Sequence, residues 1–375
     1  MTETVRKKWL ERIHAHNDRP TPYVLTDLTV IQNNAMQLKE RLKGVKLYFA
    51  VKSNSDPRII DALDGIVDGF DIASLGEWEQ LKKKKVSPKR ILFSNPTKIP
   101  THITKTYKDG LRYYAIDGVD EIKKMSKFAP EAKVYLRVQV SDYGSKFPLS
   151  KKFGLLPEHV VEYASFAESM GLKVCGLAFH VGSQAENPRV WESAFEICGG
   201  LMKRLQHLGM EMEFLDIGGG FPADYGQPIP TMATTCRAIN RAIKKHIPKG
   251  IEIVAEPGRF LVAESSVIVT EIIARENRSG VDWLHVDMGA FQGLIEPLEI
   301  GLKYPVFTDK SHRGYKKEFT LTGPSCDAYD TLGTDYLLPS EIEMGDRIYI
   351  GSAGAYALVY GSNFNGFKIP ETYYV

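Results

Sequence analysis

The amino-acid sequence predicts an α/β fold, a (β/α)8 barrel of the TIM type with an antiparallel β domain attached. Two observations favour this fold class. Eight short apolar runs follow one another along the chain, separated by segments of helical length and period. After residue 259 the pattern changes to segments rich in β-branched and aromatic residues, interrupted by turns. Because barrel active sites form at the C-terminal ends of the strands, the residues that close the apolar runs are candidates for catalysis.

The eight apolar runs nearly all stop at a polar residue suited to catalysis. In chain order the closing residues are Lys52, Asp71, Asn95, Asp117, Arg137, His180, Gly218 and Glu256. Helical segments lie between the runs, for example DPRIIDALDG, LPEHVVEYASFAESMG and PRVWESAFEICGGLMKRLQHLG. The last of these places its apolar residues mostly on one face, as expected of a helix that covers a barrel.

We expect two domains, because 375 residues are too many for one ordinary core. The barrel would occupy residues 27–265. Residues 1–26 would join residues 266–375 in a β-sandwich or β-barrel domain, with TPYVLTD as a strand or linker. Strand-like segments of this second domain are FLVAESSVIVTEII, WLHVDMG, EFTLTGPSCD and DRIYIGSAGAYALV.

Composition limits the classes of partner. The net charge of +2 gives no reason to expect nucleic acid or a membrane as a partner. No stretch reaches the roughly 20 apolar residues of a membrane span, and the N-terminus does not read as a signal peptide. The four cysteines lack CxxC spacing, which argues against a metal site and a disulfide framework. We therefore expect a cytoplasmic protein.

Two features of the strand ends point to a phosphorylated carbonyl cofactor. Lys52 closes an apolar run, and burial there would lower its pKa and free the amine for a Schiff base. The three glycines of Gly218–Gly220 can turn several backbone N–H groups toward an anion, after the seventh strand, where such barrels usually bind phosphate. Arg259 of EPGR adds a planar donor that matches phosphate geometry.

Two further residues specify which cofactor. Glu256 ends a run that should be buried, so its carboxylate needs a cationic partner such as a protonated pyridine nitrogen. His180 ends the sixth run, where its ring could lie flat on an aromatic cofactor. Together with the lysine and the phosphate site, these residues predict pyridoxal 5′-phosphate, which stabilises a carbanion during amino-acid chemistry.

Seven segments in order carry a family resemblance: YFAVKSN, GFDIASLGE, HVGSQ, LDIGGGFP, EPGR, GPSCDAYD and AGAYALVYGSNFNGF. With them the chain resembles the fold-type III pyridoxal-phosphate decarboxylases, the ornithine/diaminopimelate decarboxylase family, over essentially its whole length. Within that family it is most similar to the bacterial ornithine/lysine decarboxylases, judging by DMGAFQGLIEPLEIGLKYP and SNFNGF. The resemblance implies the alanine racemase/ornithine decarboxylase-like fold.

The resemblance also implies roles for matching residues. Lys52 would bind the cofactor aldehyde, and His180 and Glu256 would contact its ring. Further cofactor contacts would come from Asp71, Arg137, Ser183, Gly218, Gly219, Gly220, Arg259 and Tyr356. Family members complete their active sites across a homodimer interface, so Cys326 would come from the second subunit as the acid that protonates Cα. Asp327 would contact the distal amine of the substrate.

The chain's own chemistry agrees with Cys326, which lies in a polar loop, whereas the other cysteines lie in apolar or helical settings. Diaminopimelate decarboxylases typically have a cysteine–glutamate–serine run here, and this chain does not. The acidic segment LIEPLE supplies Glu296 and Glu299 as candidate contacts for a distal ammonium. L-Ornithine, decarboxylated to putrescine for polyamine biosynthesis, is therefore our first choice of substrate.

Alternatives stay open. L-Lysine is the second choice and a specialised amino acid of a siderophore or antibiotic pathway the third, because Glu299 stands where ornithine decarboxylases usually have an aspartate. An amino-acid racemase would need a tyrosine as the opposing acid–base residue, where this chain has Cys326. An inactive regulatory homologue would lose catalytic residues that are all present here.

Overall fold

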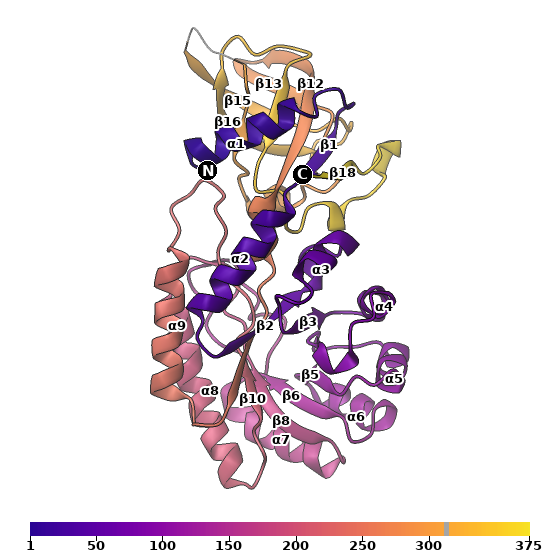
Figure 1. Ribbon diagram of the computed structural model, residues 1–375, viewed down its shortest axis with the longest axis vertical. Helices are drawn as coiled ribbons and strands as arrows, with labels where there is room; N and C mark the ends of the chain where they lie inside the picture. Colours follow the sequence, from indigo (N-terminus) through magenta and orange to yellow (C-terminus); the bar gives the residue numbers. More distant parts are fainter. Residues whose placement is uncertain (311–314) are drawn as a thin grey trace. The chain divides into compact units, whose positions relative to one another are not determined.

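The computed structural model describes residues 1–310 and 315–375 and divides the chain into two compact units (Figure 1). The barrel unit comprises Gln32–Pro222 and Ile229–Phe260. The β unit comprises Met1–Ile31, Ala223–Pro228 and Leu261–Val375. The short segment Ala223–Pro228 therefore interrupts the barrel unit in sequence while belonging to the β unit.

Eight strands of the barrel unit close into a parallel barrel in the order β10-β11-β2-β3-β4-β5-β6-β8. The strands are β2 (Val45–Ala50), β3 (Gly69–Ile72), β4 (Ile91–Phe93), β5 (Tyr113–Ile116), β6 (Lys133–Arg137), β8 (Lys173–Ala178), β10 (Phe214–Asp216) and β11 (Glu252–Ala255). They coincide with the eight apolar runs of the sequence, so the predicted barrel is confirmed. Near-continuous apolar runs are expected where a strand is buried on both faces.

Helices alternate with the strands, beginning with α2 before β2, and cover the barrel from outside (Figure 1). They are α2 (Leu28–Arg41), α3 (Pro57–Leu63), α4 (Leu75–Lys83), α5 (Pro100–Lys108), α6 (Val119–Phe128), α7 (Val160–Ser169), α8 (Arg189–His207) and α9 (Met232–His246). Side-chain caps fix several helix starts, since Asp56, Ser74 and Thr231 each accept a backbone N–H at the beginning of α3, α4 and α9. A two-stranded pair of β7 (Ser145–Phe147) and β9 (Ser183–Ala185) is added beside the barrel strands.

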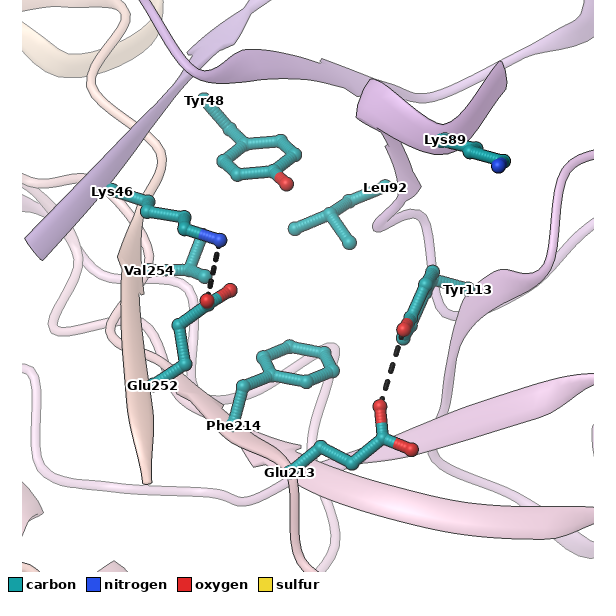
Figure 2. A pocket seen from close by; sticks show the side chains of 9 residues that line it. All are labelled: Lys46, Tyr48, Lys89, Leu92, Tyr113, Glu213, Phe214, Glu252 and Val254. Atoms are coloured by element: carbon teal, nitrogen blue, oxygen red, sulfur yellow. Dashed lines mark hydrogen bonds and ion pairs between the residues drawn. The ribbon is translucent and has the colours of Figure 1, made fainter. Parts of the chain in front are cut away.

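The N-terminal end of the barrel holds a hollow of about 270 Å³ (Figure 2). Figure 2 shows two interacting pairs on opposite sides of Phe214. Lys46 pairs with Glu252, and the Tyr113 hydroxyl donates to Glu213 at 3.1 Å. The carboxylates at this end are therefore satisfied by neighbouring side chains of the barrel itself, which suits a structural role.

The β unit contains a sheet with strand order β14-β17-β12-β13-β15-β16, to which β1 and β18 are added through β12. Its strands are β1 (Tyr23–Thr26), β12 (Ser266–Arg278), β13 (Val281–Val286), β14 (Val306–Phe307), β15 (Lys316–Thr322), β16 (Thr331–Pro339), β17 (Arg347–Ile350) and β18 (Glu371–Tyr374). One correction to the prediction is needed. Most pairs are antiparallel, but β13 with β15 and β1 with β18 are parallel. The long connections between these partners allow the chain to return in the same direction.

A helix that the sequence pattern did not predict, α1 (Glu3–His14), begins the β unit. The Thr2 side chain caps its first turn, and Trp9 and Ile13 are buried on one face. These two side chains join the core cluster of Tyr23 and Val267. Among the described residues, no helix has both the length and the apolar sequence of a membrane span.

Candidate active site at the C-terminal end of the barrel

Lys52 and Asp71 form an ion pair where β2 and β3 end. Ala50 is the register partner of Asp71, and the chain turns after Ala50 into a 3₁₀ turn, Val51–Ser53, that carries Lys52. The Lys52 Nζ lies 2.7 Å from Asp71 Oδ2. The Lys52 side chain is 42% exposed and paired with a carboxylate, so it is only partly shielded from water.

The carboxyl group of Glu77 lies close behind this ion pair and was not among the predicted site residues. Its Oε2 accepts the N–H of Ala73 at 2.6 Å, just before α4 begins. Burial raises the pKa of Glu77 to about 7, and the negative charge of Asp71 acts in the same direction. The sequence signal was the serine–x–x–glutamate pattern of a capping box, Ser74 with Glu77.

Glu256, which directly follows β11, sits at one end of a hydrogen-bonded chain. Ser94 donates its hydroxyl to Glu256 Oε1, and the Tyr135 hydroxyl lies 2.8 Å from Ser94 Oγ. Burial raises the pKa of Glu256 well above its usual value, and the neighbouring carboxyl groups of Asp216 and Asp71 raise it further. A cation placed against Glu256 would be needed to keep it ionised.

Asp216, at the end of β10, is a buried carboxyl group that was not among the predicted site residues. Its Oδ1 accepts the N–H of Gly218 at 2.8 Å, and its carboxyl group lies beside that of Glu256. Burial raises the pKa of Asp216 to about 7. Asp216 is the first polar residue after the apolar start of FLDIGGG, so it could have been predicted from the end of its strand like the other candidates. For this strand Gly218 was predicted instead, because of the three adjacent glycines.

The segment Gly218–Gly220 has no room for side chains. Gly218 has φ +63°, and a Cβ there would lie 2.5 Å from the carbonyl oxygen of Phe179. A Cβ at Gly219 would lie 2.8 Å from the carbonyl oxygen of Glu256. The glycines thus let the loop pack directly on neighbouring backbone and keep its surface open to a ligand.

His180 and Arg137 are largely enclosed at the same end. His180 Nδ1 accepts the N–H of Gly182 at 3.0 Å. Burial lowers the pKa of His180 well below its usual value, and the positive charges of Arg137 and Lys52 add to this effect. The ring is therefore neutral, with its proton on Nε2. Burial also lowers the pKa of Arg137, but the surrounding carboxylates, Glu256 first, oppose that loss.

Arg259 and Ser183 extend the site beside the glycine segment. Arg259 is buried, its Nε donates to Ser183 Oγ at 3.1 Å, and its guanidinium lies 4.5 Å from the ring centre of Phe147. Phe147 and Ser183 are register partners in the β7–β9 pair. This small sheet therefore holds the arginine in place, with a hydroxyl and a guanidinium side by side.

The other predicted site residues belong to the β unit. Cys326 is exposed, and its thiol lies 3.8 Å from the side-chain oxygen of Asn365. The loop that carries it is anchored by Asp330, which is fully buried and accepts the N–H groups of Ser325 and Ala290 at 3.0 and 2.7 Å. Asp327 accepts the N–H of Tyr329 in the same loop.

Glu296, Glu299 and Tyr356 lie elsewhere in the β unit. Glu296 is buried at the start of α11 (Glu296–Ile300), whereas Glu299 is exposed. Pro297 lies in the first turn of this short helix, where a proline is tolerated. Tyr356 is in the left-handed region with φ +51°, and its ring stacks on Tyr360. Positive φ is unusual for a tyrosine and often marks a functional position.

The barrel end fits pyridoxal phosphate on three observations. Asp71 Oδ1 is buried and has no hydrogen-bond partner among the described residues, so it can accept a proton donor from a ligand. Glu256 would be matched by a cationic ring nitrogen. The glycine segment with Ser183 and Arg259 offers the donors that a phosphate requires. Groups of three or more side chains suited to hold a metal ion are absent from the described residues.

Comparison with known proteins agrees with this geometry. Residues 28–263 match the family described as pyridoxal-dependent decarboxylase, pyridoxal binding domain. A lysine/ornithine decarboxylase of Selenomonas ruminantium is 31% identical, over 94% of this chain and 89% of that protein.

Two solved structures are similar over nearly their whole length. A lysine/ornithine decarboxylase of Vibrio vulnificus complexed with cadaverine has a TM-score of 0.90 and 28% identity, covering 98% of both chains. The arginine decarboxylase of Paramecium bursaria Chlorella virus bound to agmatine has a TM-score of 0.92 and 26% identity, covering 98% of this chain and 100% of that one. The family match and the barrel end together show that the chain belongs to the pyridoxal-dependent decarboxylases, the family that its sequence motifs predicted.

Proposed function

We propose that the protein decarboxylates a basic L-amino acid, with L-ornithine as the preferred substrate and putrescine as its product. The observation that carries this proposal is the placement of Lys52, Glu256 and the glycine segment around one end of the barrel. The names of the relatives support the substrate class, since they act on lysine, ornithine or arginine. Solved neighbours hold cadaverine, putrescine and agmatine, which are all amines with a distal cation.

The residues of the barrel unit would share the work as follows. Lys52 would bind the cofactor aldehyde through Nζ, with Asp71 orienting this nitrogen from 2.7 Å. The neutral ring of His180 would lie against the cofactor ring without adding a positive charge, and Glu256 would hold the ring nitrogen in its protonated form. The cofactor, when bound, supplies the electron sink for the carbanion left by loss of CO2.

The phosphate would be held by Ser183, Arg259 and the glycine segment. A dianion here would meet backbone N–H groups, a hydroxyl and a guanidinium, which together satisfy its acceptor oxygens. Arg137 would remain a fixed positive charge near the ring. These are all binding and orienting roles, so each should change cofactor affinity when the side chain is removed.

We also propose that the protein acts as a homodimer in which the partner subunit supplies Cys326 and Asp327. Cys326 would protonate Cα, and the Asp327 carboxylate would bind the distal ammonium. The proposal is supported by large apolar side chains that are exposed in the β unit. They lie near the loop of Cys326 in the sequence, or near Asn365, whose side chain contacts the Cys326 thiol. They are Tyr329, Val359, Tyr360, Phe364, Phe367 and Ile369. A partner subunit would remove this apolar surface from water.

The first experiment measures CO2 release from ornithine, lysine, arginine and diaminopimelate. The proposal expects the highest kcat/KM with ornithine, and faster turnover of diaminopimelate would overturn the basic-substrate assignment. Borohydride reduction of the holoprotein followed by peptide mapping should place the label on Lys52. The matched control is Lys46→Ala at the opposite end of the barrel, which should keep normal turnover, whereas Lys52→Ala should lose nearly all of it.

A second experiment tests the shared site. Lys52→Ala and Cys326→Ala subunits, each of which should form almost no putrescine alone, are mixed under conditions that allow subunit exchange. Half of the resulting dimers would be mixed, each with one intact site, so putrescine formation should return to about a quarter of the wild-type value. No recovery in a mixture shown to exchange would argue against a site built from two subunits.

A further inference from the structure

The buried carboxyl group of Asp216 joins two parts of the candidate cofactor site. On one side its Oδ1 accepts the N–H of Gly218, at 2.8 Å. On the other side its carboxyl group lies beside that of Glu256, and the two groups interact directly. Only 1% of the Asp216 residue is exposed, so both interactions are shielded from water.

The backbone reinforces this connection. The N–H of Glu256 donates to the carbonyl oxygen of Gly218 at 2.8 Å, and Ile217 donates to Val254 at 2.8 Å. β10 and β11 therefore continue side by side past their last paired residues. The side chain of Asp216 adds a third link between the same two segments, and it is the link that reaches the Glu256 carboxyl group.

Glu256 is also held from a second side. Ser94 at the end of β4 donates to Glu256 Oε1, and Tyr135 of β6 contacts the Ser94 hydroxyl at 2.8 Å. Glu256 is thus held by both Ser94 and Asp216. A carboxylate fixed in this way has one orientation to offer to a ligand.

We propose that Asp216 is a positioning residue that sets the Glu256 carboxyl group in register with the glycine segment, so that ring nitrogen and phosphate are bound in one cofactor orientation. This inference rests on the proposed function, in which Glu256 meets the ring nitrogen and Gly218–Gly220 meet the phosphate. Asp216 itself contacts neither group. Its effect passes through the two segments that it joins.

The test compares Asp216→Ala with Asp216→Asn in the full-length protein. Asparagine keeps the oxygen that accepts the Gly218 N–H, and its amide can donate to Glu256. Alanine keeps neither interaction and leaves a buried Gly218 N–H and a Glu256 oxygen without their partner. The readouts are the dissociation constant for pyridoxal phosphate and the absorbance spectrum of the bound cofactor, so that no result depends on turnover alone.

We expect Asp216→Ala to weaken cofactor binding by about tenfold or more and to change the bound spectrum, since a buried group loses its partner. Asp216→Asn should bind within about threefold of wild type with the original spectrum. The matched control is Asp68→Ala, because Asp68 also accepts a backbone N–H, that of Leu47 at 2.9 Å, but at the other end of the barrel. It should bind the cofactor normally.

Two results would overturn the inference: Asp216→Ala with wild-type affinity and spectrum, or a folded Asp216→Asn that binds as poorly as the alanine variant. If Asp216→Ala does not fold, Asp216→Ser replaces it, because serine cannot reach both partners. Glu256→Gln is measured in parallel. If this variant also leaves binding and spectrum unchanged, the proposed function fails; if it alters them while Asp216→Ala does not, the positioning role alone fails.

Discussion

Replacing Gly218 by alanine tests whether the close packing of the glycine segment is needed for cofactor binding. Two costs follow from the structure. A residue with a Cβ at φ +63° costs about 1–2 kcal/mol relative to glycine. In addition, the new Cβ would lie 2.5 Å from the carbonyl oxygen of Phe179 and 3.0 Å from the ring of His180.

The second cost acts on the site itself. An ordinary contact begins at about 3.4 Å, and a backbone carbonyl cannot swing away as a flexible side chain would. The glycine segment or the His180 ring must therefore shift, at a cost of about 1–3 kcal/mol. Losing one charge-assisted hydrogen bond to the phosphate would weaken binding by roughly ten- to a hundredfold.

The matched control is Gly44→Ala. Gly44 has φ +73°, and a Cβ added there would meet no atom of the described chain within 4 Å, so this variant carries the conformational cost without the clash. Urea denaturation should show a similar conformational loss in both variants and an added loss in Gly218→Ala. Titration with pyridoxal phosphate should show weaker binding for Gly218→Ala alone. Equal behaviour of the two variants in both assays would refute the reasoning.

Two further predictions concern Glu77 and Cys326. Because the folded pKa of Glu77 is raised to about 7, the native state holds a proton that the unfolded state, with a pKa of about 4.3, releases. The free energy of unfolding should therefore fall as the pH rises from about 4.5 to about 7, by up to about 1.4 kcal/mol per pH unit. In urea titrations, Glu77→Gln should remove this contribution to the pH dependence of the free energy of unfolding. A slope that is identical in the variant would show that another group titrates. Cys326→Ala should still release CO2 but protonate the wrong atom and yield aldehyde, measured by chromatography of the products, whereas the buried Cys198→Ala should yield clean amine; clean amine at the normal rate from Cys326→Ala would exclude its acid role.

The barrel could be predicted from the sequence because its signals are local. Each buried strand is an apolar run, and its end is marked by the first polar residue. The order of runs and helices then fixes the topology, since parallel strands need helical crossovers. The parallel pairing in the β unit could not be predicted in this way, because β1 and β18 come from opposite ends of the chain.

The site was predictable one strand end at a time, but its connections were not. Lys52, His180 and Glu256 each follow an apolar run, whereas the chain from Tyr135 through Ser94 to Glu256 joins three separate strands. Such contacts depend on register around the closed barrel, which no local pattern encodes. The ion pair of Lys52 with Asp71 could not be predicted for a related reason, because the strand stops two residues earlier and the lysine is carried on a turn.

Electrostatics explains why these connections matter to a cofactor. Asp71, Asp216 and Glu256 bring three carboxyl groups to one buried end of the barrel, and Lys52 already pairs with Asp71. Asp216 and Glu256 both have raised pKa values, so the protein retains a proton between them instead of burying two negative charges. A cationic ring nitrogen against Glu256 would replace that proton as the positive charge that neutralises the buried pair. The site is therefore built with one positive charge to be supplied by its ligand, and a neutral ring at the same place would leave the carboxyl pair protonated.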